Sequence, residues 1–105
     1  MSPTLSILTP VGRAFNDEII DVVAPGVEGS FAVLIGHAPL IAALETGIVK
    51  VRRATEDLQY FVLDRGLLEV RNDDIAILAD HVESATDAAD AESKVKGMLA
   101  DSAGA

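Results

Sequence analysis

The chain from Leu5 to Asp80 is built from short apolar-rich runs that are separated by turn residues such as Pro-Gly, Thr-Gly and Asn-Asp. In the runs 49–52, 60–64 and 74–77, apolar residues recur at every second position, as they do in a strand with one buried face. Short strands at this spacing are typical of a β-sandwich or a β-barrel. The pattern therefore predicts an all-β body for this part of the chain.

The run from Phe31 to Ile35 is apolar at every position, so both faces of this strand are apolar. A strand of this kind lies either at the centre of a sheet between two layers or under a partner protein. The pattern leaves both alternatives open. It makes the surroundings of this run the first place to look for a functional surface.

The pattern changes after Asp80, where alanine replaces β-branched residues and apolar residues recur at helical spacing. Thr86 or Asp87 is placed to cap a helix of roughly 13 residues, and Asp90 forms a favourable pair with Lys94 one turn later. The sequence thus predicts a helix that starts at about Asp87.

Length and pattern together set the expected architecture. A chain of 105 residues is long enough for one compact domain with a real core. We expect a mainly β fold class, with a β-sandwich domain over residues 1–84. One short C-terminal α-helix and a tail follow over residues 85–105.

The composition excludes several kinds of site and partner. The chain has no cysteine, which removes disulfides, thiolate metal sites and cysteine nucleophiles. Its formal net charge of -9 disfavours nucleic acid and anionic lipid headgroups, because both are negatively charged. No apolar run approaches the roughly 20 residues that a membrane-spanning helix needs. Residues 1–5 show no basic region followed by an apolar run, so no secretory signal is expected.

A catalytic or metal site is the weaker of two interpretations of the histidines. Asp80, His81 and Glu83 are close in sequence, and they would combine imidazoles with carboxylates if the fold brought His37 to them. The other interpretation places one histidine on a loop and the other at a strand-to-helix junction, without chemistry. Because the chain also lacks a glycine-rich phosphate loop and a serine-centred elbow, we expect no catalytic residue, no cofactor and no metal.

The segment from Gly26 to Leu40 carries the strongest signal in the sequence. Its first four residues, Gly-Val-Glu-Gly, suit a tight turn between two strands with positive φ at a glycine. Its last five residues, Gly-His-Ala-Pro-Leu, contain Pro39, which restricts the preceding residue to extended backbone and removes a hydrogen-bond donor. His37 is therefore expected on a rigid bend, a kind of structure that often serves recognition.

The ordered series of features around this segment resembles the epsilon subunit of F-type ATP synthases. The series begins with a strand ending in Thr-Pro and continues through Gly-x-x-Gly-x-Phe-x-Val-Leu-x-Gly-His-Ala-Pro-Leu. It then includes Glu-Thr-Gly-Ile-Val at 45–49, Gly-Leu-Leu-Glu-Val at 66–70 and Ile-Leu-Ala-Asp at 77–80. The match is in register over most of residues 4 to 80. The resemblance implies a sandwich of about ten short strands.

The resemblance also implies a role without chemistry. Epsilon subunits are non-catalytic parts of the rotor, and they link the gamma subunit to the membrane-embedded c-ring in the central stalk during proton-driven ATP synthesis. Such a subunit would be a peripheral protein at the cytoplasmic face of the bacterial inner membrane. A second hypothesis, from another class, is a stand-alone β-sandwich module that binds a small ligand or a peptide.

By the same resemblance, two groups of residues would face partner subunits. The first group falls where the family faces gamma: Thr9, His37 and Ala42. The second group falls on the turn that faces the c-ring: Glu28, Gly29 and Ser30. Some relatives carry an acidic residue at the position of Ser30, so an electrostatic contact with a basic c-ring loop would shift to Glu28.

The tail departs from the family. Relatives commonly continue into a helical hairpin that inhibits ATP hydrolysis, and some bind ATP through an Ile/Leu-Asp-x-x-Arg-Ala motif near its start. The aligned stretch here is Thr-Asp-Ala-Ala-Asp-Ala at 86–91, and Asp90 stands at the arginine position, where an anion repels the nucleotide. We therefore expect no ATP binding. A single helix of roughly 13 residues, about 20 Å long, is also too short for an inhibitory extension.

Overall fold

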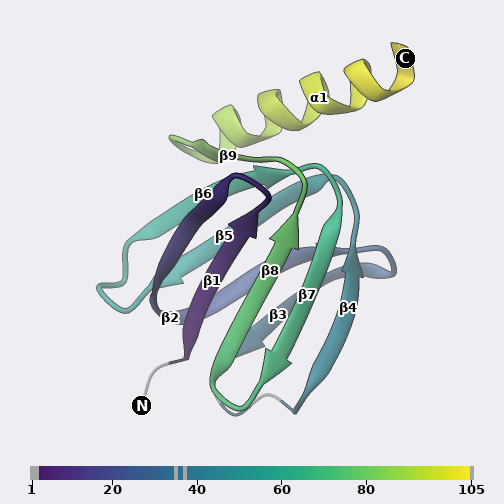
Figure 1. The fold of residues 1–105 in the computed structure, drawn as a ribbon. Coiled ribbons are helices and arrows are strands. Elements are labelled where there is room, and N and C mark those ends of the chain that lie inside the picture. The colour runs from purple at the N-terminus through teal and green to yellow at the C-terminus, as the bar shows by residue number, and fades with distance from the viewer. Residues whose placement is uncertain (1–2, 35, 37, 105) are drawn as a thin grey trace.

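Nine strands and one helix make up the described part of the chain in the computed structural model, which covers residues 3–34, 36 and 38–104 (Figure 1). The predicted fold class, a mainly β structure with one C-terminal helix, is confirmed. The elements in chain order are β1 (Thr4–Thr9), β2 (Gly12–Gly26), β3 (Gly29–Leu34), β4 (Leu40–Leu44), β5 (Gly47–Arg53), β6 (Leu58–Leu63), β7 (Gly66–Arg71), β8 (Asp74–Ala79), β9 (Val82–Ala85) and α1 (Ala88–Gly104).

The strands form two layers that share the long strand β2. The first half of β2 pairs with β1, and its second half pairs with β3 and β5. One layer contains β1, β8, β7 and β4, and the other contains β3, β2, β5, β6 and β9 (Figure 1). Strands β2 and β4 meet at a single register position, Gly26 opposite Leu44. Apart from this one position, no pairing between described residues joins the two layers at β3 and β4, so the sandwich is open on this side.

Inward-facing side chains of both layers form one core. Ile7, Ile77 and Leu68 stand opposite one another on β1, β8 and β7, and all three are fully buried. No polar or charged side chain of the described residues is buried in this core. The inward residues of the runs 49–52, 60–64 and 74–77 are buried as predicted: Val49, Val51, Phe61, Leu63, Ile75 and Ile77. In the run 60–64 the other face is not wet, because Val62 is also fully buried.

The doubly apolar strand is an edge strand. Val33 is buried and Phe31 packs against the core, but Leu34 on the opposite face is 51% exposed. β3 pairs with β2 and lies off the main path of the sheet. The fold therefore excludes the first alternative, a central strand between two layers, and leaves a strand that exposes an apolar face. Ile35, the last residue of the run, lies outside the described residues.

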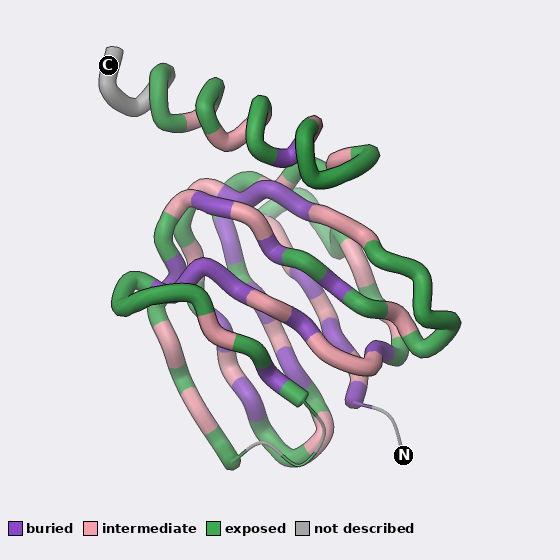
Figure 2. Tube along the Cα trace, turned by 180° about the vertical axis from the view of Figure 1, so that it is seen from behind, coloured by how far each residue is buried: buried purple, intermediate pink, exposed green. Residues whose placement is uncertain are grey.

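The helix α1 lies across β9 and β6 at one end of the sandwich (Figure 1). Its start is capped by Asp87, whose Oδ1 accepts the N–H of Asp90 at 2.8 Å, and the predicted pair of Asp90 with Lys94 is present at 3.4 Å. The helix has 17 residues, more than the expected length of roughly 13. Ala91 alone among its described side chains is fully buried, so most of the helix surface faces solvent (Figure 2).

An ion pair ties the end of β5 to β2. The Arg53 Nη2 donates to the Asp17 Oδ2 at 2.6 Å. This hydrogen bond, followed by the one from the Glu18 N–H, lowers the pKa of Asp17 below its ordinary value of 3.8. Because the pKa is lower in the folded than in the unfolded state, the pair stabilises the fold fully above about pH 4. The stabilisation is lost as the pH falls through the folded pKa.

We therefore expect Asp17→Asn to lower the free energy of unfolding near neutral pH and to have no such effect in acid. The measurement is urea denaturation of both proteins at several pH values between neutrality and about pH 2. Arg53→Gln removes the same hydrogen bond from the other side and should show the same pH dependence. A difference from the parent chain that stays constant over the whole pH range would contradict this account.

Candidate functional site

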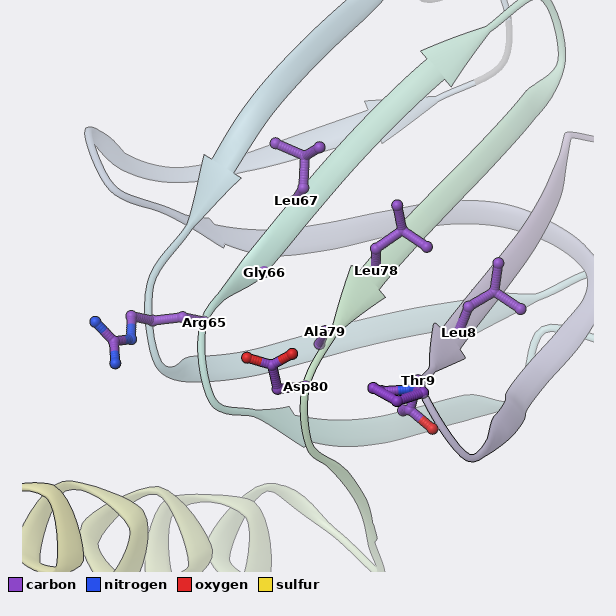
Figure 3. Close-up of a pocket in the computed structure, with 9 residues that line it drawn as sticks. Leu8, Thr9, Arg65, Gly66, Leu67, Leu78, Ala79 and Asp80 are labelled. Carbon is purple, nitrogen blue, oxygen red and sulfur yellow. The ribbon is translucent and has the colours of Figure 1, made fainter.

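Four apolar residues cross the outer face of the layer formed by β1, β8, β7 and β4. In the ladder, Leu8 stands opposite Leu78, Leu78 opposite Leu67, and Leu67 opposite Ala43. We call these four residues the apolar row. Leu67 is 40% exposed and Leu78 is 46% exposed, and Figure 3 shows the side chains of Leu8, Leu78 and Leu67 projecting from neighbouring strands. A continuous exposed apolar surface of this kind is a candidate for a protein-protein contact.

The next register position extends the apolar surface at β4. Here the same outer face carries Ser6, Ala76, Glu69 and Ile41. Ile41 is 67% exposed, whereas the Glu69 carboxylate lies 3.5 Å from the Arg71 guanidinium. The outer face of this layer is thus apolar along the row and at Ile41 on β4. It is polar at Ser6 and Glu69, one register position from the row.

A shallow hollow of about 470 Å³ lies where the row meets the ends of β1, β7 and β8. Gly66 belongs to its wall, and a Cβ at this position would lie 2.4 Å from the Leu78 carbonyl oxygen. Glycine is therefore required for the close approach of β7 to β8. The hollow is lined by Leu8, Thr9, Pro10, Arg65, Gly66, Leu67, Leu78, Ala79 and Asp80 (Figure 3).

The period-2 analysis missed the apolar row because it assigned the run 74–77, in β8, one wet face and did not cover β1 and β7. A signal was present: β1, β7 and β8 each contain two adjacent large aliphatic residues. In each pair one residue is buried and the other faces outward: Ile7-Leu8, Leu67-Leu68 and Ile77-Leu78. Since strict alternation places a polar residue beside each buried one, these doublets indicate a second apolar face.

Two of the three residues predicted to face gamma, Thr9 and Ala42, lie apart in the structure. Thr9 lines the hollow at the end of the apolar row. Ala42 stands opposite the buried Leu68, so its side chain points inward, while its two strand neighbours face outward. β8 and β7 lie between the strands of Thr9 and Ala42. His37 lies outside the described residues.

The turn between β2 and β3 has the geometry that the sequence predicts. Two residues join Gly26 to Gly29, and Gly29 has the predicted positive φ, at 126°. Gly26 is required for a different reason: a Cβ there would lie 2.7 Å from the Gly29 carbonyl oxygen. All three residues predicted to face the c-ring are exposed on this turn: Glu28, Gly29 and Ser30.

Comparisons with known proteins now identify the family. The family model described as ATP synthase, Delta/Epsilon chain, beta-sandwich domain matches residues 2–85. The chain belongs to this family. The ATP synthase epsilon chain of Dehalococcoides mccartyi is 39% identical over 102 residues, which cover 92% of this chain and 72% of that relative. The epsilon chain of Campylobacter jejuni is 34% identical over 109 residues, which cover 95% and 84%.

Solved structures of ATP synthases share the fold. A chain of the mitochondrial ATP synthase of Euglena gracilis matches with a TM-score of 0.74 at 20% identity, covering 79% of this chain and 53% of that one. A chain of the central stalk and c-ring structure from Tetrahymena thermophila matches with a TM-score of 0.69 at 17% identity, covering 79% and 66%. This chain therefore spans about half the length of the Euglena chain that it matches.

Membership in the ATP synthase epsilon family confirms the resemblance and a non-catalytic role, in preference to a stand-alone binding module. The His81 Nε2 lies 3.4 Å from the Glu83 Oε2, and no three His, Cys, Asp or Glu side chains of residues 3–34, 36 and 38–104 are grouped to hold a metal. In the same described part of the chain, no helix is both long and apolar enough to cross a membrane.

Asp90, which the resemblance places at the arginine position of a nucleotide motif, accepts a hydrogen bond at the start of α1. Its Oδ2 accepts the Thr86 N–H at 3.0 Å. This bond, and then the nearby charge of Lys94, lower the pKa of Asp90 below its ordinary value. The carboxylate is therefore ionised at neutral pH, and it stabilises the first helical turn.

Proposed function

We propose that this chain is the epsilon subunit in the central stalk of a proton-driven ATP synthase, where it links gamma to the c-ring. Membership in the complex follows from the family, and the apolar row supports a docking role within it. The row lies on the outer face of the sandwich, and α1 lies on the other layer, against β5, β6 and β9. Burial of the row against gamma removes this apolar surface from water and supplies the affinity of the contact.

The two proposed contacts are mechanically connected through β4. The Ala43 carbonyl accepts the Val27 N–H at 3.1 Å, and the Glu45 N–H donates to the Pro25 carbonyl at 2.9 Å. These hydrogen bonds join the β2–β3 turn, which faces the c-ring in this proposal, to the strand that ends the apolar row. Torque therefore passes from one contact to the other through backbone hydrogen bonds rather than through a flexible loop.

The proposed role is docking, with the inhibitory and ATP-sensing functions of the C-terminal region reduced or absent. We infer that the subunit is peripheral, at the cytoplasmic face of the bacterial inner membrane, and that it reaches the membrane only through the complex. The ionised Asp90 supports the absence of an ATP site, because it repels a phosphate chain.

The test is binding of the full chain to the cognate gamma subunit and then to the c-ring. We expect a stoichiometric complex with gamma at micromolar concentration. Glu28→Lys should weaken retention of the c-ring by the complex, and it should change gamma binding much less. The matched control is Glu56→Lys, which makes the same charge change on the exposed turn between β5 and β6. The absence of any gamma complex at micromolar concentration would overturn the proposal.

A further inference from the structure

Two strand edges face each other across a groove on the side where the layers part. β3 pairs with β2 and β4 pairs with β7. In the described part of the chain, no strand pairs with the other edge of β3, and the other edge of β4 meets β2 at one position only. The groove between them has a volume of about 670 Å³, and it is lined by the β2–β3 turn, β3 and β4.

The β4 edge lacks the features that normally protect an edge strand. Its sequence over Leu40–Leu44 is Leu-Ile-Ala-Ala-Leu, with no charge, no proline and no bulge in its ladder with β7. The edge strand β9 differs, because it has Glu83 within four residues and is covered by α1. Proteins that leave a flat apolar edge open aggregate through it. The bare edge of β4 therefore indicates that another strand covers it in the assembled state.

The known hydrogen bonds of β4 show which backbone groups face the groove. The carbonyl of Ala43 accepts the Val27 N–H at 3.1 Å, so Ala43 directs its backbone groups away from β7. Residues two apart in a strand direct these groups the same way, so the N–H and C=O of Ile41 point into the groove. Ala42 directs its groups toward β7. A strand added at this edge thus finds a donor and an acceptor at Ile41.

We propose that an extended, uncharged segment of gamma, the subunit docked on the apolar row, adds as a strand to the free edge of β4. This inference rests on the proposed function. Ala43 belongs to the apolar row, and the side chain of Ile41 lies on the same outer face. The free edge of β4 is therefore continuous with the proposed gamma contact. Glu28, on the exposed turn, is the single charged residue among those that line the groove, so the rest of the lining is uncharged and fits an uncharged segment.

The charge of the chain argues against a second copy as the occupant. Each copy carries a formal net charge of -9, so two copies joined edge to edge repel each other. Because the Ala43 carbonyl already accepts the Val27 N–H, the added strand pairs with β4 at Ile41 rather than along the whole strand. Its main-chain hydrogen bonds supply affinity, and its alternate side chains enter the groove or extend the apolar surface.

Hydrogen exchange on the full chain tests the added strand directly. On binding gamma, the amide of Ile41 should become protected, because its N–H gains a hydrogen-bond acceptor. The amide of Ala42 serves as the internal control, since it faces β7 and should be protected before and after binding. A complex that forms without new protection at Ile41 would overturn the inference and leave the proposed function intact.

A pair of variants at one position separates the backbone from the side chain. Ile41→Pro removes the N–H that faces the groove, and proline is tolerated at such edge positions because the bonds to β7 are kept. We expect it to weaken gamma binding about three- to tenfold, the effect of one backbone hydrogen bond. Ile41→Val keeps the N–H and a branched apolar side chain, so it should bind within about twofold of the parent chain.

Each remaining outcome has a distinct meaning. Equal gamma binding by Ile41→Pro and Ile41→Val would overturn the inference. A free chain that forms dimers which Ile41→Pro abolishes would make a second copy the occupant, and would also overturn it. Failure of the parent chain to bind gamma at all would overturn the proposed function and this inference together. Thermal unfolding of both variants should stay close to that of the parent chain, which confirms that the fold is intact.

Discussion

Leu67→Glu is expected to abolish the complex with gamma while leaving the fold of the free chain intact. Leu67 lies in the middle of the apolar row and is 40% exposed, so a carboxylate there remains in water in the free chain. In the complex the same carboxylate would be buried against an apolar surface without a partner. This burial costs about 2–4 kcal/mol or more, which corresponds to a loss of affinity of at least about thirtyfold.

Leu58→Glu is the matched control for this experiment. Leu58 is 50% exposed and belongs to β6 in the other layer of the sandwich. It should bind gamma like the parent chain in calorimetric titration, and both variants should unfold at similar temperatures. Equal losses of affinity in both variants would mean that the row is not the contact. Normal binding by Leu67→Glu would exclude the row as the gamma surface.

Leu68→Ala should have the opposite effect, a large loss of stability from a substitution one residue farther along β7. Leu68 is fully buried in the core, opposite Ile77 on β8. Removal of its side chain loses the transfer free energy and leaves a cavity, at a cost of about 2–5 kcal/mol. That cost is a large part of the total stability of about 5–15 kcal/mol expected of a single domain.

Leu67→Ala provides the comparison for this prediction. The same chemical change at the exposed neighbour should lower the free energy of unfolding by less than about 1 kcal/mol. Urea denaturation at constant pH measures both values, and the slope with denaturant should be the same in both variants. Similar losses of stability at positions 67 and 68 would contradict the assignment of β7 to one buried and one outward apolar face.

Local signals in the sequence predicted the elements well. The period-2 runs became strands with the expected buried residues, Asp87 became the helix cap, and the Gly-Val-Glu-Gly segment became a tight turn. These features depend on neighbours within a few residues, such as the amide that a cap accepts or the φ that a glycine allows. The helix is longer than predicted, because α1 continues to Gly104.

The apolar row and the inward orientation of Ala42 were not predicted, because both depend on pairing between distant strands. Leu8 and Leu78 are far apart in the sequence, and they become neighbours because β1 lies parallel to β8. Ala42 turned inward because β4 pairs with β7 in one particular register. A shift of one residue would have placed it on the outer face. Positions carried over from the family could not contain that information for this chain.

The sequence by itself determined the strands, the turn glycines, the capped helix and the family, because each depends on local chemistry or on an ordered series of motifs. A two-residue period specifies that a strand has two faces, but it does not specify which neighbours each face will meet. Only the tertiary structure decided that the outer leucines of β1, β8 and β7 form one row. It also decided that the edge of β4 stays open, because both features arise from long-range pairing.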